Sequence, residues 1–329
     1  MSPRSLLRQK FLKDNNYLSE NLQFLASDMS VRQYYRLSDS CRVLMDAPPP
    51  EKCDQYIAIA RFLIKIGLRA PIVFEYHLGY GFLLIEDFGD RTFSKVLKEN
   101  PDQEEFLYKM AIDSLKYLHQ QVKEQPLFIE EYDVSKMLSE VKVFMDWYWP
   151  TVKDQASYQE ACDSFLKAWR EILLGLPSTP QSLVLRDYHV DNLMHVKGQN
   201  TLEQCGLLDF QDAVWGSVVY DFISLVEDAR RDVDADLQVI LWEKFLENIP
   251  AFEHENYREV ATAIGAARHM KVMGVFSRFA LKGGNSSYLN HIPRLWRYLF
   301  LALKHPTLSP LKKWFDQFFP LNTQKVFSL

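Results

Sequence analysis

The sequence predicts a two-lobed α+β fold, in which a small N-terminal β-sheet lobe precedes a larger, mainly helical C-terminal lobe. Two observations support this division. Short apolar runs typical of strands are concentrated in roughly the first ninety residues. From Asp102 onward, apolar residues recur mostly at helical spacing. We place the boundary at residue 88, so that the lobes comprise residues 1–88 and 89–329.

The first lobe contains three predicted strands and one helix. A strand at Arg42–Met45 stops at the prolines of residues 48–50, because proline cannot donate to a sheet. The next segment has apolar residues at 56, 59, 60, 63 and 66, which lie on one face of a helix that ends near Gly67. Two further strands, Ile72–Tyr76 and Gly81–Glu86, flank a turn at Gly79.

The second lobe is predicted to be mostly helical. Apolar stripes at helical spacing lie within residues 107–118, 137–148 and 161–172. Further helices are expected at 218–233, 237–248, 257–281 and 295–304. Two β-rich runs, Ser182–Leu185 and Gly206–Leu208, interrupt these helices, and we expect them to form one embedded hairpin.

The composition is that of an ordinary globular protein and excludes several classes of partner. The chain has 329 residues, of which 47% are apolar and 25% are charged. Its formal net charge of −5 lacks the basic footprint of a nucleic-acid-binding protein. No run of about 18 apolar residues is present, so no membrane span is expected.

The N-terminal segment and the cysteines both favour a cytoplasmic protein. Residues 1–16 carry four basic side chains but no apolar core of a signal peptide, and we favour a solvated helix face over a helix lying on a membrane. The four cysteines are far apart and never form a C-x-x-C pair. Reduced thiols of a cytosolic protein fit this pattern best.

The strongest chemical signal lies around the two β-rich runs. Asp187 stands five residues before Asn192, and Asp209-Phe210 follows seventeen positions after the asparagine. The catalytic loops of kinases have an aspartate and an asparagine at this spacing, and a strand ending in Asp-Phe comes later. A solvated polar loop is the alternative for either half alone. The two halves together favour a kinase.

The chemistry of phosphoryl transfer explains these residue types. One carboxylate must accept a hydrogen bond from the attacking hydroxyl, for which Asp187 is the candidate. A second pair of oxygen donors must hold Mg²⁺ against the phosphates. Mg²⁺ prefers hard oxygen ligands, so Asp209 and the amide oxygen of Asn192 suit it.

At these residues the sequence resembles the aminoglycoside phosphotransferase and choline kinase superfamily, whose fold is protein-kinase-like. It is most similar to the branch that phosphorylates N-acetylmuramate and N-acetylglucosamine at the anomeric hydroxyl during cell-wall recycling. The similarity extends over nearly the whole chain. The segments that carry it are residues 30–36, 43–49, 82–89, 186–194, 206–233, 268–278 and 292–298.

The resemblance implies a role for individual positions. Asp187 would be the catalytic base, and Asn192 and Asp209 the magnesium ligands. The hinge of the nucleotide-binding lobe would hold adenine through backbone groups of Glu86, Asp87 and Phe88. Asp221 would be a buried carboxylate that braces the catalytic loop. An acidic residue near a helix N-terminus explains Asp221 about equally well.

Three departures from the general kinase pattern qualify the resemblance. Leu185 replaces the histidine that usually precedes Arg-Asp, and residues 26–30 supply no glycine-rich loop over the phosphates. The strand at residues 41–46 lacks the lysine that usually holds the phosphates. Arg32 and Arg36 are our candidates for the replacing cation, with ordinary surface arginines as the alternative.

Candidate substrate residues lie in the helical lobe. Trp147 belongs to an aromatic cluster that we expect near a helix end, because Pro150 follows it, although such clusters are usually core. Arg268 and Lys271 stand at positions i and i+3 of one predicted helix and face the same way. A solvated charged stripe is the simpler explanation for these two. The alternative is a cationic wall for an acidic substrate.

The leading hypothesis is therefore a kinase that uses ATP and Mg²⁺ to phosphorylate a small-molecule amino sugar. A kinase of aminoglycosides or choline is the first alternative, and its site would need carboxylates or an aromatic cage around a cationic substrate. The C-terminal helices carry arginines and lysines instead. A nucleotide-binding pseudokinase is the second alternative, against which the intact Asp187, Asn192 and Asp209 argue. The sequence gives no indication of the oligomeric state.

Overall fold

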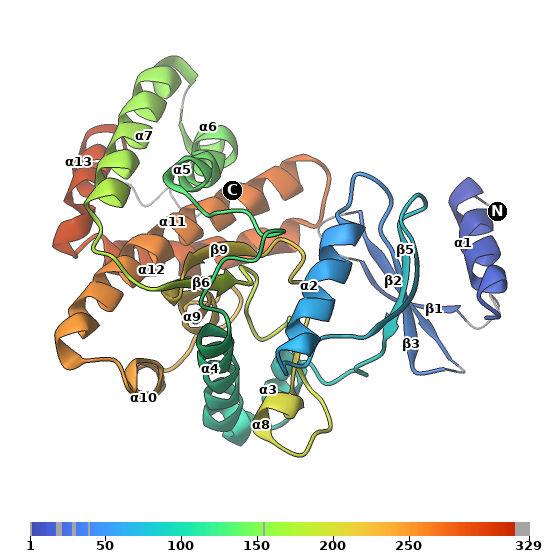
Figure 1. The fold of residues 1–329 in the computed structure, drawn as a ribbon. Coiled ribbons are helices and arrows are strands. Elements are labelled where there is room, and N and C mark those ends of the chain that lie inside the picture. Colours follow the sequence, from blue (N-terminus) through green and yellow to red (C-terminus); the bar gives the residue numbers. More distant parts are fainter. Residues whose placement is uncertain (1, 18–21, 28–30, 39, 154, 320–329) are drawn as a thin grey trace. The chain divides into compact units, whose positions relative to one another are not determined.

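The computed structural model describes residues 2–17, 22–27, 31–38, 40–153 and 155–319 (Figure 1). The chain divides into two compact units. The first comprises residues 1–129 and 185–213, and the second comprises residues 130–184 and 214–329. The boundary predicted at residue 88 falls inside the first unit and remains a prediction.

A five-stranded antiparallel sheet forms the centre of the first unit. Its strands lie in the order β1-β2-β3-β5-β4. They span Leu22–Ser27 (β1), Gln33–Leu37 (β2), Arg42–Asp46 (β3), Val73–His77 (β4) and Phe82–Glu86 (β5). The central strands β3 and β5 are almost entirely buried, and Leu44 lies opposite Leu84. Their apolar runs explain why the sequence predicted these strands.

Helix α1 (Pro3–Asp14) packs against one side of this sheet through Phe11 and Leu12, which lie in one cluster with residues of β2, β3 and β5. Its arginines bind Asp46 at the end of β3: Arg4 Nε lies 2.8 Å and Arg8 Nη1 lies 3.5 Å from the carboxylate. Asp46 is only 2% exposed. The predicted solvated helix face is confirmed for Lys10 and Lys13, which are exposed. It is wrong for Arg4 and Arg8, because a buried carboxylate needs a cationic partner.

Helix α2 (Cys53–Lys65) lies on the other side of the sheet (Figure 1). The stripe predicted from the sequence is buried from Tyr56 to Leu63, and the helix is followed by Gly67 with a φ of 93°. The remaining elements of the first unit are α3 (Phe93–Glu99), a 3₁₀ turn (Pro101–Gln103), α4 (Glu104–Gln121), β7 (Leu193–His195), α8 (Thr201–Gln204) and β8 (Cys205–Leu207).

The second unit is mainly helical and is built around α11 (His254–Leu281). Gly274 lets α11 lie close to the backbone at Val143, since a Cβ at position 274 would lie 2.3 Å from the Val143 carbonyl oxygen. The other α-helices are α5 (Val134–Val143), α6 (Trp149–Val152), α7 (Tyr158–Gly175), α9 (Val219–Val226), α10 (Ala235–Leu246), α12 (Ile292–Ala302) and α13 (Ser309–Phe318). A π-helical turn spans Phe144–Tyr148, and 3₁₀ turns span Gln155–Ser157, Ala251–Glu253, Ser286–His291 and Pro306–Leu308.

The predicted hairpin is wrong. The run at residues 182–185 belongs to β6 (Gln181–Val184), which pairs with β9 (Val214–Ser217). The run at 206–208 overlaps β8, which pairs with β7. Strands β7 and β9 are three and four residues long, too short for an alternating pattern to identify them.

Two predicted helix boundaries also differ from the structure. The helix expected to reach residue 233 ends at Val226, and the Asp228 carboxylate accepts from the Arg230 amide beyond it. Pro150 does not end the preceding helix. It stands in the first turn of α6, which follows directly on the π-helical turn Phe144–Tyr148, so the helical chain continues past it. Among the described residues, no helix combines the length and apolar character that a membrane span requires.

Candidate functional site

The loop that contains Asp187 and Asn192 closes on itself through the asparagine. Asn192 Nδ2 donates to the Asp187 carbonyl oxygen at 3.0 Å, and the Asn192 amide donates to His189 at 2.9 Å. Arg186, directly before Asp187, has a φ of 73°. A non-glycine residue in the left-handed region is strained, and such strain is common at functional sites. The Asp187 side chain is exposed.

Pairing of β7 with β8 brings Asp209 to the same place. The ladder sets Leu193 opposite Leu207, and the Leu208 amide donates to the Asn192 carbonyl oxygen at 3.0 Å. Asn192 Nδ2 then lies 3.4 Å from Asp209 Oδ2. Asp209 is also in the left-handed region, with a φ of 57°. The structure therefore brings together the three residues that the motif predicted.

Asp209 and Asn192 fit the donor set that Mg²⁺ requires. Both side chains carry hard oxygens, and they lie side by side at this turn, where Asn192 Nδ2 rather than its amide oxygen faces Asp209. No group of three or more His, Cys, Asp or Glu side chains is arranged to hold a metal in the part of the chain that the structure describes. A cation at Asp209 would therefore take its other ligands from phosphates and water, which is how Mg²⁺ is usually bound at nucleotide sites.

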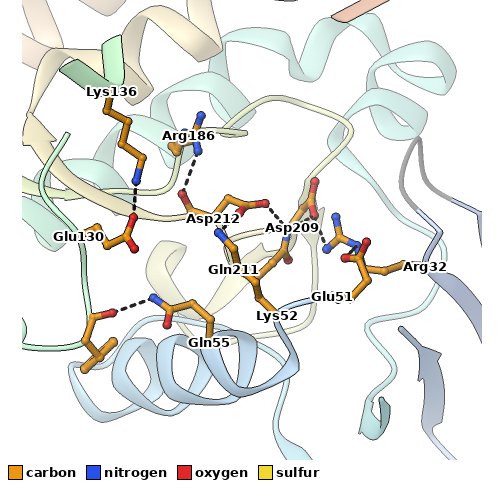
Figure 2. Close-up of polar contacts among 11 residues, drawn as sticks. Arg32, Glu51, Lys52, Gln55, Glu130, Lys136, Arg186, Asp209, Gln211 and Asp212 are labelled. Atoms are coloured by element: carbon orange, nitrogen blue, oxygen red, sulfur yellow. Dashed lines mark hydrogen bonds and ion pairs between the residues drawn. The ribbon is translucent and has the colours of Figure 1, made fainter. Parts of the chain in front are cut away.

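Arg32 also reaches this turn (Figure 2). Its Nη1 lies 3.1 Å from Asp209 Oδ1, and its Nε lies 3.4 Å from a carboxylate oxygen of Glu51. The Arg32 side chain is 7% exposed. Gln211 Nε2 donates to the same Asp209 oxygen at 2.8 Å. Asp209 Oδ1 thus forms an ion pair with Arg32 and accepts a hydrogen bond from Gln211, whereas Oδ2 accepts from Asn192 Nδ2.

A second ion pair joins the start of α2 to this turn. Lys52 Nζ lies 3.0 Å from Asp212 Oδ1, and the side chains are 61% and 38% exposed, respectively. Burial would raise the pKa of Asp212. The hydrogen bond from Lys52 and the positive charges of Lys52 and Arg186 outweigh that effect, so the pKa lies below its ordinary value.

The predicted hinge, Glu86 to Phe88, is held by two arginines. Arg69 forms two hydrogen bonds with the Glu86 carboxylate, at 2.5 and 2.8 Å, and its guanidinium lies 4.6 Å from the centre of the Phe88 ring. Arg36 binds Asp87 through Nε at 2.5 Å and Asp90 through Nη1 at 2.8 Å. The hydrogen bond to Asp87 is the main cause that raises the pKa of Arg36 above its ordinary value.

Most backbone amides of the hinge already have partners. The Glu86 amide donates to Ile72, the Asp87 amide donates to Cys41, and the Gly89 amide donates to the Asp87 carboxylate. Among the described residues, nothing accepts from the Phe88 amide. One hinge N–H therefore remains available to a ligand.

Arg32 and Arg36 thus have different surroundings. Arg32 lies at Asp209, where a metal-bound phosphate would be placed, whereas Arg36 is tied to the hinge. Both remain predicted phosphate ligands, and the geometry favours Arg32. Residues 28–30, part of the segment that replaces a glycine-rich loop, lie outside the described residues.

The substrate candidates all belong to the second unit. Arg268 is 6% exposed, and no described residue accepts a hydrogen bond from its Nη1. Lys271 forms an ion pair with Glu140 at 3.0 Å. Trp147 is partly exposed, and Lys282 Nζ lies 5.2 Å from the centre of its ring. The π-helical turn that carries Trp147 packs against α11, which carries both cations.

Asp221 also lies in the second unit, in the first turn of α9. It is 1% exposed, which agrees with the expectation of a buried carboxylate. Its bracing role remains a prediction. His269, next to Arg268 on α11, is fully buried, and its Nε2 lies 2.6 Å from Glu227 Oε2.

Sequence reasoning missed Glu51, Arg69 and Gln211. Glu51 and Arg69 act from positions distant in sequence, and nothing in the local pattern indicates their partners. For Gln211 the sequence held a signal, because this polar residue stands only two positions after Asp209. In the structure Gln211 is 3% exposed.

Comparisons with known proteins agree with this geometry. The sequence model of the phosphotransferase enzyme family matches residues 21–260. The chain is 31% identical over 301 residues to the N-acetylmuramate/N-acetylglucosamine kinase of Pseudomonas putida, covering 88% of this chain and 86% of the relative. It is 31% identical over 314 residues to the enzyme of that name from Neisseria meningitidis serogroup B, covering 88% of each chain.

Solved structures show the same fold at low sequence identity. A gentamicin complex of APH(2″)-IIa matches with a TM-score of 0.63 and 13% identity, over 90% of this chain and 96% of that one. A choline/ethanolamine kinase family protein from Mesorhizobium loti matches with a TM-score of 0.60 and 12% identity, over 89% of this chain and 91% of that one. The predicted α+β, protein-kinase-like fold is confirmed. The chain belongs to the phosphotransferase enzyme family.

Proposed function

We propose that this enzyme is an ATP- and Mg²⁺-dependent kinase that phosphorylates N-acetylmuramate, and also N-acetylglucosamine, on the anomeric oxygen. The enzyme would act in the cytoplasm, in the recycling of cell-wall sugars. The observation that carries the proposal is the meeting of Asp187, Asn192 and Asp209 beside Arg32. The substrate class is taken from relatives about 30% identical over most of the chain, whose names give both sugars.

The exposed Asp187 carboxylate would accept the hydrogen bond of the sugar hydroxyl and then its proton. As the sugar oxygen forms a bond to the γ-phosphorus, the bond from that phosphorus to the β–γ bridging oxygen breaks and ADP departs. Arg32 would bind the phosphate oxygens and stabilise the charge that develops on them. Mg²⁺, held by Asp209 and Asn192, would neutralise part of the phosphate charge when bound. Positioning and electrostatics supply most of the rate in such transfers.

The hinge would recognise adenine through the Phe88 amide, which has no acceptor among the described residues. The carboxylates of Glu86 and Asp87 are paired with arginines and would not contact the base. Recognition by backbone rather than by side chains follows from this pairing.

A screen of acceptors tests the proposal directly. Purified enzyme with Mg²⁺ and ATP should consume ATP in the presence of either sugar, and the product should no longer reduce alkaline copper. A reducing product would place the phosphate elsewhere on the ring. Turnover of an aminoglycoside or choline with neither sugar accepted would overturn the substrate class, and nucleotide binding without any turnover would indicate a pseudokinase.

The lactyl carboxylate of N-acetylmuramate calls for a cation, and the structure favours Arg268 over Lys271. Lys271 is already paired with Glu140, whereas Arg268 is buried with an Nη1 that lacks an acceptor among the described residues. An unsatisfied buried cation gains most from a charged ligand.

We predict that Arg268→Ala raises the KM for N-acetylmuramate roughly tenfold and the KM for N-acetylglucosamine much less, since a charge-assisted hydrogen bond is lost only for the first sugar. Steady-state kinetics with both sugars measures this difference. Lys271→Ala is the matched control and should change both constants little. Equal effects of Arg268→Ala on both sugars would exclude a carboxylate clamp at this position.

A further inference from the structure

The end of α9 places one carboxylate directly on α11, within the second unit. Glu227, the residue after α9, lies over a turn of α11 that has no side chain at position 265, because a Cβ at Gly265 would lie 3.1 Å from Glu227 Oε2. The same oxygen lies 2.6 Å from Nε2 of His269, about one turn further along α11. The Glu227 carboxylate therefore lies on the surface of α11 beside positions 265 and 269.

His269 fixes this carboxylate in place. A carboxylate can only accept a hydrogen bond, so Nε2 of His269 is the donor. The histidine is fully buried, and its ring stacks on that of Tyr298 in α12, with the ring centroids 5.2 Å apart. Among the described residues, nothing donates to the other oxygen, Oε1 of Glu227. Since the Glu227 side chain is 29% exposed, a ligand can reach this second oxygen.

The same turn of α11 carries Arg268. Residues three and four positions apart are neighbours on the surface of an α-helix, with Cβ atoms about 5–6 Å apart. Arg268 therefore stands beside Gly265, on which the Glu227 carboxylate lies. In the described part of the chain, no ion pair joins Arg268 to Glu227, and Arg268 Nη1 has no acceptor. A cation and an acceptor oxygen thus lie on neighbouring positions of one helix without using each other.

This combination complements one edge of the proposed sugars. If Arg268 binds the lactyl carboxylate, it does so beside C3 of the ring, to which the lactyl group is attached through O3. The neighbouring C2 bears the acetamido group of both sugars, and its N–H needs an acceptor once it leaves water. The hydroxyl at C4 also lies next to C3, but a hydroxyl can rotate toward other acceptors and can itself accept. The acetamido N–H has the stricter requirement, which Oε1 of Glu227 would meet.

We propose that Glu227 accepts a hydrogen bond from the acetamido N–H of the sugar, through the oxygen that His269 leaves free. His269 is the positioning residue of this carboxylate and does not touch the sugar. The inference rests on the function proposed above, in which Arg268 binds the lactyl carboxylate. Arg268 would then select N-acetylmuramate, whereas Glu227 would select the 2-acetamido group that both sugars share.

Competition by sugar analogues against N-acetylmuramate turnover tests the role of Glu227. 2-Deoxyglucose lacks the acetamido group at C2, and 4-deoxy-N-acetylglucosamine lacks only the hydroxyl at C4. The wild type should bind N-acetylglucosamine more tightly than 2-deoxyglucose. Glu227→Gln should reduce this preference roughly tenfold, as expected for the loss of a hydrogen bond to a charged group. The single amide oxygen of the variant would stay with His269, and its NH₂ group would face the sugar N–H.

The preference for N-acetylglucosamine over the 4-deoxy sugar should not change in Glu227→Gln. Contacts of the acetyl carbonyl and methyl groups exist in both proteins, so the change in the C2 preference reports the N–H alone. Each preference is a ratio measured on one preparation, so a lower folded fraction does not alter it.

Asp232→Asn is the matched control. Asp232 is a carboxylate of the same segment, but it pairs with Arg294 and Arg297 rather than with His269. Its loss should leave both preferences at their wild-type values. His269→Phe keeps a ring on Tyr298 and removes the donor, so it should reduce the C2 preference and have no further effect in the Glu227→Gln background.

An unchanged C2 preference in Glu227→Gln would overturn the proposal, and so would a change at C4 instead of C2 or the same change in Asp232→Asn. Additive losses from Glu227→Gln and His269→Phe would overturn the positioning role of His269. A wild type that phosphorylates neither sugar would instead overturn the proposed function. Should Glu227→Gln fail to fold, Glu227→Asp, which withdraws the carboxylate by one methylene, takes its place in every comparison.

Discussion

At the scale of single residues, Asp187 combines an exposed carboxylate with a backbone fixed from two sides. Asn192 binds its carbonyl oxygen, and the strained Arg186 precedes it. The direction of the side chain is therefore set by the loop, since no side chain in the described part of the protein holds the Asp187 carboxylate. Such a group is suited to take a proton from an incoming hydroxyl.

Replacing Asp187 with asparagine should lower kcat about 10²–10⁴-fold while leaving ATP affinity nearly unchanged, because the carboxylate acts on the acceptor and not on the nucleotide. Single-turnover kinetics and calorimetry on the same preparation measure the two quantities. A variant that retains nearly the wild-type kcat would show that Asp187 is not the base.

The two candidate arginines can be separated by a ligand that lacks phosphates. Arg32→Ala should weaken ATP binding roughly tenfold and adenosine binding little, because Arg32 lies at Asp209. Arg36→Ala should weaken both ligands similarly, because Arg36 holds Asp87 of the hinge. Lysine at position 32 should restore ATP binding only in part, since an ammonium cannot grip two oxygens in the arginine geometry.

The opposite pattern, with Arg36→Ala selective for ATP, would assign the phosphates to Arg36. Binding titrations with ATP and adenosine on each variant distinguish the two outcomes. Equal affinities of the wild type and both variants for ATP would show that neither arginine contributes to nucleotide binding.

At the scale of elements, the sequence predicted the strands and helices that have a local apolar periodicity. It did not predict which strands pair when the partners are distant along the chain. Strands β3, β4 and β5 and helix α2 carry clear apolar periodicity, and each lies close to its predicted range. Strands β7 and β9 are too short for a pattern, and their partners are separated from them along the chain. The sequence therefore predicted strands near 182 and 206 but paired them with each other.

Helix α4 contains a histidine, His119, whose pKa lies below its ordinary value. Burial lowers the pKa of His119 to about 3, and the nearby Lys123 acts in the same direction. In the unfolded chain a histidine has a pKa of about 6.5. As the pH falls below that value, the unfolded state gains a proton that the folded state does not, so the free energy of unfolding falls until the pH approaches the folded pKa.

His119→Gln should remove this dependence. Between about pH 7.5 and about pH 5.5, the wild type should lose about 1 kcal/mol more of its free energy of unfolding than the variant. Urea denaturation at both pH values measures the difference, and it is independent of any general destabilisation that the substitution causes. Parallel losses in the two proteins would show that His119 is protonated in the folded state.

At the scale of the whole molecule, the candidate groups are distributed between the two units. The first unit holds Asp187, Asn192, Asp209, Arg32 and the hinge, whereas Arg268, Lys271 and Trp147 belong to the second. The motif predicted which residues come together because Asp187 and Asn192 lie in one loop, and the β7–β8 ladder adds Asp209.

The partners of that cluster could not be predicted in the same way. Arg32 meets Asp209 across most of the first unit's sequence, and Glu51 pairs with Arg32. Arg69, which precedes β4, pairs with Glu86 at the end of β5. A single sequence records which residue types are present but not which distant segments close on each other. The resemblance supplied roles for individual positions, while the ion pairs that orient them required coordinates.

The hinge has a thermodynamic consequence. Its two carboxylates are tied to Arg69 and Arg36, so its backbone is preorganised for a ligand. Fixing one residue costs about 1–2 kcal/mol of conformational entropy, and here that cost belongs to folding rather than to nucleotide binding. If adenine binds here as proposed, it would meet a rigid edge, and little of its binding free energy would be spent on ordering the chain. Replacing Arg69 or Arg36 would leave the hinge backbone less ordered in the free protein. Its ordering would then occur on nucleotide binding, and the affinity would fall although no contact to the base is removed.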